Sequence, residues 1–372
     1  MKILFINLPY YGHVVPTIGL VQKLIAQGCE VTYLIPFGWE DIVAESKAQF
    51  AGYQNHKQLS EQIQNAYATA EQIVEQFDMI IYEQFFFPGK HLAEKYQKPV
   101  VRVFTAPVAD KVLMDEYISA GGPLGIFRYK WIARAWTKDI AGHCAISMKT
   151  DNWLDEIIDN SPELNLVYTL REYQPYVEKF PTAQYKFLGP SIYERKKEAF
   201  DFAKGENPVI YISLGTIVKG AKKFFQQCME AFRNEPIDVI VSIGKGFEAK
   251  TLKNIPENVH VYSSVPQIEV LRMANVFITH GGMNSISEVL VYECYAAWWY
   301  HVGVIGYVHF SEAFEYIRVV EPIAEAFDAY VVLGREFRLC FGLAIHDSRY
   351  CGCLLQTLVP LTILSPVTWH SS

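Results

Sequence analysis

The sequence predicts an α/β protein built from two Rossmann-like domains that face a shared cleft. Short apolar runs alternate with amphipathic stretches along the first 290 residues, a pattern typical of parallel sheets covered by helices. The rhythm breaks once, at the charged segment 194–207, and then restarts. Each half also has a polar, glycine-containing loop directly after an apolar run. In doubly wound sheets, such loops lie where ligands bind.

The first domain opens with a strand, a loop, a helix and a second strand. Ile3 to Leu8 is an apolar run suited to a strand buried on both faces. The segment PYYGHVVP is expected to be a loop, with Pro16 in the first helical turn and Gly28 as the helix stop. Further helices are expected at 62–77, 91–96 and within 111–160, and further strands at 31–35, 79–82, 100–104 and 185–188.

The second domain repeats this rhythm. We expect strands at 208–214, 239–243, 259–262 and 276–279, and helices at 224–232, 267–273 and from about 285. The sequence is therefore divided into an N-terminal domain (1–193), a linker (194–207), a second Rossmann-like domain (208–290) and an atypical tail (291–372).

Composition excludes several function classes. The net charge of −7 argues against a nucleic-acid-binding surface. No stretch of eighteen apolar residues suggests a membrane-spanning helix, and the polar Asn7 interrupts the first apolar run, so it does not resemble a signal peptide. Cys351 and Cys353 have no second pair at zinc-site spacing, so no metal site is expected. A cytoplasmic protein without stable membrane insertion is the expectation.

The segment VPQIEVLRMANVFITHGGMNSISE, residues 265–288, carries the strongest signal. A strand runs into a Gly-Gly turn and a polar helix start, which together make an anion site. His280, Asn284 and Ser285 add donors there, and Glu288 could accept hydrogen bonds from ribose hydroxyls. The alternative is a structural turn in which Ser285 and Glu288 form a capping box.

This segment resembles the nucleotide-sugar signature of family 1 UDP-glycosyltransferases, in particular the bacterial macrolide and flavonoid glycosyltransferase-like branch. The likeness spans residues 1 to about 290 and implies the GT-B arrangement of two Rossmann-like domains. By resemblance, Val265 and Gln267 bind the uracil, and Glu288 holds the ribose. The resemblance also implies that His280, Gly282, Asn284 and Ser285 contact the diphosphate, and that Ser213, Gly215 and Thr216 face the nucleotide.

His13 is the candidate general base. It follows the first strand at the carboxyl edge of the sheet, and histidine as a residue type is suited to proton abstraction near neutral pH. A loop histidine alone is more often structural, but the family uses the equivalent residue to deprotonate the acceptor hydroxyl. The family's partner is an aspartate after the third strand, and the matching residue here is Glu83, which adds a methylene. The alternatives are that Glu83 is a solvated loop carboxylate and that Asp78 is the relevant acid.

Aromatic residues of the first domain are candidates for an apolar acceptor pocket. They are Phe85, Phe86, Phe87, Phe104 and Trp131, with core packing as the alternative for each. The resemblance implies an inverting transfer from a UDP-sugar to a hydroxyl of a small hydrophobic acceptor. No Asp-x-Asp pair is placed to hold a metal, so neither a metal nor a cofactor is expected.

The tail departs from the family. Family members continue with an Asp-Gln pair that binds the donor sugar, but no such pair follows residue 288. Residues 291–372 contain no lysine or asparagine and hold four of the seven cysteines. We hypothesise that the tail is out of frame or otherwise substituted and that the second domain is incomplete. The coding DNA, read in all frames, tests this.

Two other function classes remain open at this stage. The first is a catalytically defective, nucleotide-binding remnant, which the missing Asp-Gln pair favours. The second is a nucleotide-sugar epimerase on the same fold, because a fold alone does not fix function. A Rossmann dehydrogenase is poorly supported, because no G-x-G-x-x-G follows the first strand.

Overall fold

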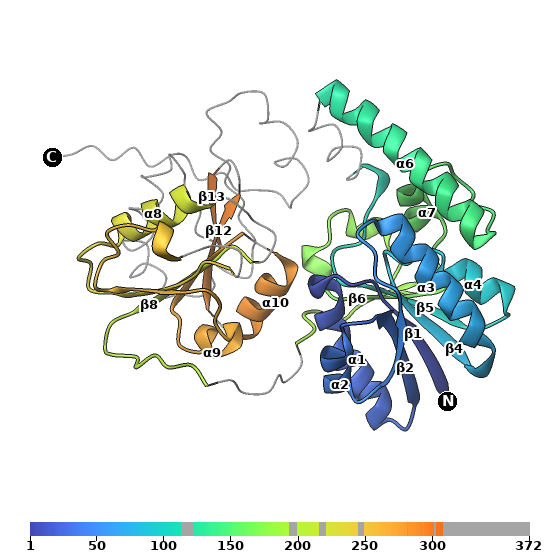
Figure 1. Ribbon diagram of the computed structural model, residues 1–372, viewed down its shortest axis with the longest axis horizontal. Coiled ribbons are helices and arrows are strands. Elements are labelled where there is room, and N and C mark those ends of the chain that lie inside the picture. Colours follow the sequence, from blue (N-terminus) through green and yellow to red (C-terminus); the bar gives the residue numbers. More distant parts are fainter. Residues whose placement is uncertain are drawn as a thin grey trace.

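The computed structural model describes residues 1–112, 122–192, 199–215, 221–244, 249–280, 282–292, 294–300 and 303–307. These residues form two separate sheets with helices packed around each (Figure 1). The first unit is drawn in blue to green and the second in yellow to orange (Figure 1). The structure thus has the two-unit α/β architecture that the alternating sequence pattern predicts.

The first sheet has seven parallel strands in the order β3-β2-β1-β4-β5-β6-β7. They are β1 (Lys2–Ile6), β2 (Glu30–Pro36), β3 (Gln49–Tyr53), β4 (Met79–Glu83), β5 (Val100–Phe104), β6 (Leu164–Val167) and β7 (Tyr185–Phe187). The chain starts in the middle of the sheet and reverses direction of growth between β1 and β4. This topological switch point is where open α/β sheets bind ligands.

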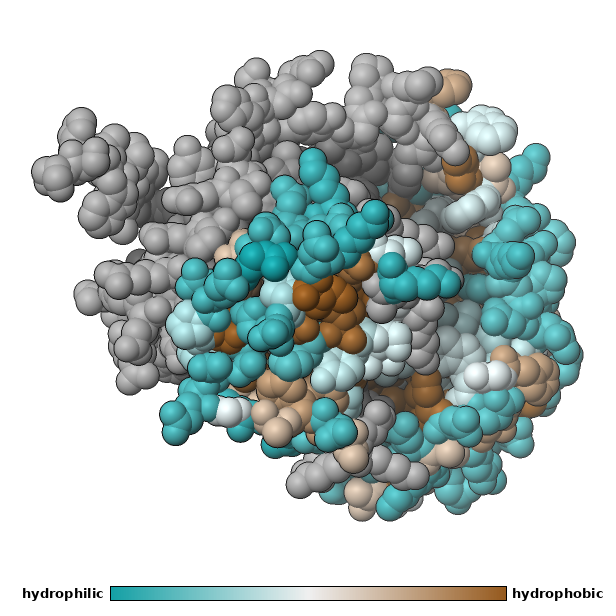
Figure 2. All heavy atoms as spheres, turned by 60° about the vertical axis from the view of Figure 1, so that its left-hand side comes forward, coloured by the Kyte–Doolittle hydropathy of each residue, from teal (hydrophilic) through white to brown (hydrophobic). Residues whose placement is uncertain are grey.

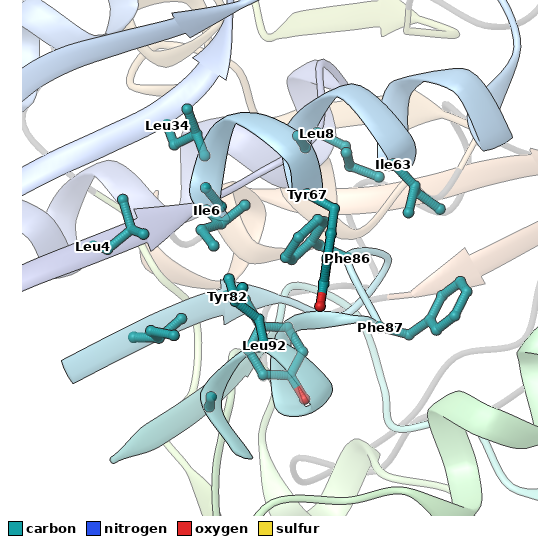
Figure 3. Close-up of a cluster of buried hydrophobic side chains, with 14 of the residues drawn as sticks. Leu4, Ile6, Leu8, Leu34, Ile63, Tyr67, Tyr82, Phe86, Phe87 and Leu92 are labelled. Atoms are coloured by element: carbon teal, nitrogen blue, oxygen red, sulfur yellow. The ribbon is translucent and has the colours of Figure 1, made fainter. Parts of the chain in front are cut away.

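Helices cover both faces of the first sheet (Figure 1). They are α1 (Tyr11–Ala26), α2 (Glu40–Ser46), α3 (Leu59–Ile73), α4 (Gly89–Lys95), α6 (Gly122–Cys144) and α7 (Trp153–Asp159). Because side chains alternate along a strand, β1 sends Leu4 and Ile6 into one apolar cluster and Ile3 and Phe5 into another. Figure 3 shows the first of these clusters. The sheet is therefore buried on both faces, as its apolar strands predict.

The second sheet has the order β10-β9-β8-β11-β12-β13. Its elements are β8 (Val209–Ser213), α8 (Lys222–Ala231), β9 (Asp238–Ser242), β10 (Val259–Tyr262), α9 (Gln267–Leu271), β11 (Val276–Thr279), α10 (Met283–Tyr292), β12 (Tyr295–Tyr300) and β13 (Gly303–Tyr307). All described pairings are parallel except β12 with β13, which is antiparallel. Its switch point lies between β8 and β11, so both sheets follow the same winding.

The start of α1 differs from the expectation. The segment predicted as a loop is helical from Tyr11, because Tyr10 serves as the N-cap residue and its carbonyl accepts from the N–H groups of His13 and Val14. His13 therefore lies in the first helical turn, and Pro16 lies inside the helix instead of at its start. Gly28 follows the helix with a φ of 83°, as expected for a helix stop.

Short elements were missed where the sequence lacks a strong apolar period. The structure adds α2, β3 and β6 to the predicted elements of the first unit. The broad helical stretch expected at 111–160 resolves into α6 and α7, while residues 113–121 lie outside the described part. No helix in the described part of the chain is long and apolar enough to cross a bilayer. Apolar side chains on the face in Figure 2 form small patches among polar ones.

The two units meet through α1 and α10, which lie side by side (Figure 1). A Cβ atom on Gly12, in the first turn of α1, would lie 3.9 Å from Nδ2 of Asn284, in the first turn of α10. The Ser191 hydroxyl donates to the Pro16 carbonyl nearby. Since α1 follows β1 and α10 follows β11, the loops at the two switch points lie opposite each other.

Candidate active site

Three neighbouring strands of the first sheet bring polar side chains together at their carboxyl ends. Glu83 is the last residue of β4, Thr105 follows the last residue of β5, and His13 lies in the first turn of the helix after β1. Since β1 pairs with β4 and β4 with β5, these positions share one edge of the sheet. The fold therefore assembles the three side chains beside the switch point.

The backbone of the histidine turn is fixed by Asn7. This fully buried side chain donates from Nδ2 to the His13 carbonyl at 3.1 Å and lies 2.9 Å from the Tyr33 hydroxyl. A buried amide is stable only when such partners satisfy it. The polar residue that interrupts the first apolar run thus anchors the turn that carries His13.

His13 Nδ1 lies 2.8 Å from Oε1 of Glu83 and 2.8 Å from the Thr105 hydroxyl oxygen. The Thr105 hydroxyl in turn donates to Glu83 Oε1 at 3.2 Å. With its proton directed at the carboxylate, the hydroxyl offers only lone pairs to the ring. Both neighbours of Nδ1 are then acceptors, so the arrangement favours the tautomer with a proton on Nδ1 and a free lone pair on Nε2.

Glu83 is buried and fully engaged. Its side chain has no exposed surface, whereas that of His13 is 22% exposed. The second carboxylate oxygen, Oε2, accepts from the Phe85 backbone N–H at 3.0 Å. Glu83 is thus not a solvated loop carboxylate, and its extra methylene does not prevent contact with His13. Asp78 instead accepts from the Lys2 N–H at the opposite end of β4.

Aromatic rings surround the exposed side of His13. The Phe85 ring centroid lies 4.7 Å from that of His13, and Tyr10 lies 5.9 Å from His13 in an edge-on orientation. Phe85 also contacts Trp153, on α7, at 6.3 Å between centroids. Tyr10 is 37% exposed. Phe85 therefore lies where an acceptor beside His13 would contact it, together with a tyrosine that sequence reasoning did not select.

The other aromatic candidates are corrected by the structure. Phe86, Phe87 and Phe104 belong to the buried core on one face of the first sheet (Figure 3 shows Phe86 and Phe87). Their side chains are at most 2% exposed, so they pack the core and line no open surface. Trp131, on α6, is instead largely exposed to solvent, at 67%. Apolar composition alone cannot separate these environments.

The second unit places its polar loops at the equivalent point. Ser213 ends β8 and is followed by Gly215, and His280 follows β11, which is the neighbouring strand. The imidazole of His280 lies between two glycines. A Cβ on Gly215 would come within 2.5 Å of its Cε1, and one on Gly282 within 2.7 Å of its Nε2. Both glycines therefore make room for the ring itself, and Thr216 lies outside the described residues.

His280 is a half-buried histidine with an unused hydrogen-bonding atom. Its Nδ1 is buried and has no hydrogen-bond partner among the described residues, and the same is true of the Thr279 hydroxyl. Burial lowers the pKa of His280 below its ordinary value. The ring is therefore neutral at pH 7. It lies at the start of α10, where the helix N-terminus favours an anion.

A hydrogen-bonded group links α9, β8 and α10. Gln267 Nε2 donates to Oε2 of Glu288 at 2.6 Å, and the Tyr211 hydroxyl donates to Gln267 Oε1 at 3.3 Å. Ser285 Oγ is 3.5 Å from the same Gln267 nitrogen. Because α10 begins at Met283, Ser285 is inside the helix and is not the N-cap of a capping box.

Val265, the other residue expected at the uracil, precedes α9 and packs at the edge of the apolar cluster around Tyr211 and Phe277. Of the residues predicted for the nucleotide site, Ser213, Gly215, His280 and Gly282 thus lie in one group of contacts, and Gln267, Ser285 and Glu288 lie in another. Asn284 lies at the contact with α1. Among the described residues, no group of three or more His, Cys, Asp or Glu side chains has the arrangement of a metal site.

Sequence reasoning missed Thr105, Tyr10 and Tyr211. A signal existed for Thr105, because it directly follows the strand that ends at Phe104 and so lies at the same sheet edge as Glu83. No comparable signal marked Tyr211, which lies within a buried apolar strand and reaches Gln267 only through its hydroxyl.

The paired switch points and the facing helices make up an architecture of the GT-B type. The structure is similar to the crystal structure of the glycotransferase of kitacinnamycin, with a TM-score of 0.67 and 23% identity, over 89% of this chain and 86% of that chain. This likeness supports the fold, and the sequence comparisons give the family.

The chain belongs to the UDP-glucoronosyl and UDP-glucosyl transferase family. The family model matches residues 190–294. The chain is 30% identical to the uncharacterized UDP-glucosyltransferase YojK of Bacillus subtilis over 324 residues, 78% of each chain. It is also 30% identical to the NDP-glycosyltransferase YjiC of Bacillus subtilis over 307 residues, 77% of this chain and 75% of that protein. The resemblance inferred from the motifs is thereby confirmed, and the protein is a nucleotide-sugar-dependent glycosyltransferase.

The family match ends at residue 294, close to residue 291, where the composition changes. The tail hypothesis concerns residues that lie almost wholly outside the described part, which ends at residue 307.

Proposed function

We propose that this protein transfers a hexose from a UDP-sugar to a hydroxyl of a small lipophilic acceptor, with inversion and without a metal ion. The observation that carries the proposal is the contact between His13 Nδ1 and the buried Glu83 carboxylate at 2.8 Å. A carboxylate in this position orients the ring and stabilises its cation, as in other base–carboxylate pairs. It leaves Nε2 as the atom that accepts a proton.

In the proposed reaction, the acceptor oxygen attacks the anomeric carbon of the donor while His13 Nε2 takes the hydroxyl proton. The bond between the anomeric carbon and the diphosphate oxygen breaks, and its electron pair leaves with UDP. Attack opposite the leaving group inverts the anomeric configuration. The Glu83 carboxylate stabilises the imidazolium that forms, and the proton is later released to solvent.

We assign the stabilisation of negative charge on the departing diphosphate to the start of α10. The backbone N–H groups at a helix N-terminus favour a phosphate, and the side chains of His280, Asn284 and Ser285 lie around this point. Their donors would act without a bound metal, which supports the proposal of metal independence. No additional cofactor is proposed, because the UDP-sugar itself supplies the leaving group.

A lipophilic acceptor fits the surroundings of His13. Phe85 and Tyr10 present aromatic surface within 6 Å of the imidazole centroid. An apolar ring stacked there would bring its hydroxyl close to Nε2. Sites for small ligands commonly combine apolar walls with a few placed polar groups. This supports a phenol or another hydroxylated ring as the acceptor class.

The first experiment measures glucose transfer from UDP-glucose to a flavonoid phenol, with and without EDTA. We expect product that is insensitive to EDTA and that decreases by about 10²–10⁴-fold in His13→Ala, the usual contribution of a general base. NMR of the product gives the anomeric configuration. Retention of the anomeric configuration would contradict inversion, and a metal requirement would contradict metal independence. Full activity of His13→Ala would contradict the role of His13 as base.

The alternative of a defective remnant is favoured by the missing Asp-Gln pair. In that case soluble protein gives no product, while UDP still raises its melting temperature. An epimerase would instead convert one UDP-sugar into another without an acceptor. The same assay distinguishes both, if the UDP-sugar pool is analysed alongside the product.

A further inference from the structure

Thr105 is the residue of the catalytic group that no motif identified. Its side chain is only 3% exposed. The hydroxyl oxygen lies 2.8 Å from His13 Nδ1 and 3.2 Å from Glu83 Oε1. The Thr105 hydroxyl therefore contacts both His13 and Glu83, at the same two atoms through which these side chains contact each other.

The contact with Thr105 restricts the long, flexible side chain of Glu83. A glutamate has one more rotatable bond than an aspartate, so its carboxylate has more orientations to lose when it is held in one place. Here each oxygen has its own anchor. The Phe85 N–H holds Oε2 at 3.0 Å, and the Thr105 hydroxyl holds Oε1. The hydrogen bond to Oε2 comes from the backbone and does not depend on side-chain identity, whereas the hydrogen bond to Oε1 depends on the Thr105 hydroxyl.

The hydroxyl also sets the protonation of the ring. Because its own proton points to Glu83, Thr105 can only accept a hydrogen bond from His13. A second acceptor at Nδ1 favours the proton there and keeps the Nε2 lone pair available. Loss of the hydroxyl would remove one acceptor from Nδ1 and one donor from the carboxylate at once.

We propose that Thr105 is a positioning residue that holds Glu83 and the Nδ1–H tautomer of His13 in the geometry needed for proton abstraction. The proposal rests on the proposed role of His13 as base. Thr105 acts through the other two side chains, so its effect should appear in turnover and in the tautomer of His13. Substrate affinity should change little.

The test compares Thr105→Val, which keeps the shape and removes the hydroxyl, with Thr105→Ser, which keeps the hydroxyl. For transfer from UDP-glucose to a flavonoid phenol, we expect Thr105→Val to lower kcat on the order of tenfold, with KM for both substrates within about twofold. Thr105→Ser should remain within about threefold of the parent. Thermal unfolding of each variant verifies that the fold is kept.

A double-mutant cycle tests whether the two residues act together. In a Glu83→Gln background, Thr105→Val should cost much less than tenfold, because the carboxylate that it positions is already absent. Equal costs in both backgrounds would overturn the proposal. So would an effect confined to KM for the donor, because Thr105 would then be a sugar contact.

A second readout does not require activity. ¹⁵N NMR of the histidine rings in the full chain reports which nitrogen of His13 carries the proton, with His13→Ala used for assignment. We expect Nδ1–H in the parent and in Thr105→Ser, and a mixture of tautomers in Thr105→Val. An unchanged tautomer in Thr105→Val would overturn the proposal. If His13→Ala keeps full activity while the tautomer shifts as expected, the proposed base is wrong and the positioning contact stands.

Discussion

The two halves of the site differ in how their polar atoms are satisfied. In the first unit, His13, Glu83 and Thr105 bond one another, and both carboxylate oxygens have donors. In the second unit, Nδ1 of His280 is buried without a partner among the described residues. A buried polar atom without a partner costs about 1–3 kcal/mol. The proposed base group is thus arranged in advance, whereas the loop before α10 would gain hydrogen bonds on binding an anion.

From this difference we expect the two units to have separate tasks. A preorganised base needs no rearrangement when the acceptor arrives, which lowers the barrier of the proton transfer. An anion site that holds neutral His280 at a helix N-terminus has more to gain from a charged ligand than from water. Changes in the first group should therefore affect turnover, and changes in the second should affect nucleotide binding.

The largest effect is expected from Glu83→Gln. The neutral amide keeps the shape of the side chain but cannot stabilise the imidazolium, and its NH₂ group favours the wrong tautomer of His13. We expect kcat to fall by about 10²–10⁴-fold. The Kd for UDP, measured by calorimetry, should stay within about twofold. This result would separate the two halves of the site.

Asp78→Asn is the matched control, because Asp78 belongs to the same segment and lies at the far end of β4. Its carboxylate accepts from the exposed Lys2 N–H, so activity should hardly change. If Glu83→Gln weakened UDP binding as strongly as it lowered turnover, the proposed division between the units would not hold.

An intermediate effect is expected from Gly215→Ala. Gly215 has a φ of 68°, and a Cβ there would come within 2.5 Å of His280 Cε1. The left-handed backbone costs roughly 1–2 kcal/mol for a residue with a Cβ, and the ring must also move. We expect the affinity for UDP to fall roughly tenfold. The His13 tautomer, followed by NMR, should not change.

Two comparisons isolate the steric cause. Gly142→Ala lies within α6, where a Cβ meets open space, so it should be neutral or stabilise the fold by up to about 1 kcal/mol. In a His280→Ala background, Gly215→Ala should still lower the folding stability by the backbone cost, but it should lower the affinity for UDP by much less than tenfold. A full tenfold loss in that background would show that His280 is not what the methyl group displaces.

Much of the fold could be predicted because its strands are buried on both faces. The run at 79–82 is continuously apolar, that at 276–279 is apolar up to Thr279, and those at 100–104 and 259–262 are interrupted only by Arg102 and His260; each forms a strand. By contrast, β3 (QFAGY) and β6 (LNLV), each with a polar residue near its start, were not predicted. The start of α1 was missed for a different reason, since aromatic residues and a glycine precede the first apolar stripe.

The site was predictable where a motif supplied the chemistry. His13 was selected from its position after the first strand and its match to the family, and Glu83 from its match to the family's aspartate; the structure places them in contact. Thr105 was not found, because its hydroxyl matters only through two side chains that are distant in sequence. The burial of Phe87 and Phe104 was also not predictable, because an aromatic residue at the end of a strand or in the loop after it can face either the core or an acceptor.

The smallest expected effect concerns pH and the nucleotide site. Burial lowers the pKa of His280 in the free protein, and a bound diphosphate would raise it, because a nearby negative charge favours the imidazolium. Binding would then take up a proton, so UDP should bind more tightly as the pH falls from 8 towards 6. Each pH unit can contribute at most tenfold, and we expect about two- to fivefold in all. Calorimetry in two buffers of different ionisation enthalpy measures the proton uptake. The His280→Asn variant should remove the part of this uptake that does not come from titration of the phosphate itself. An identical pH dependence in the variant would mean that His280 stays neutral when the nucleotide binds.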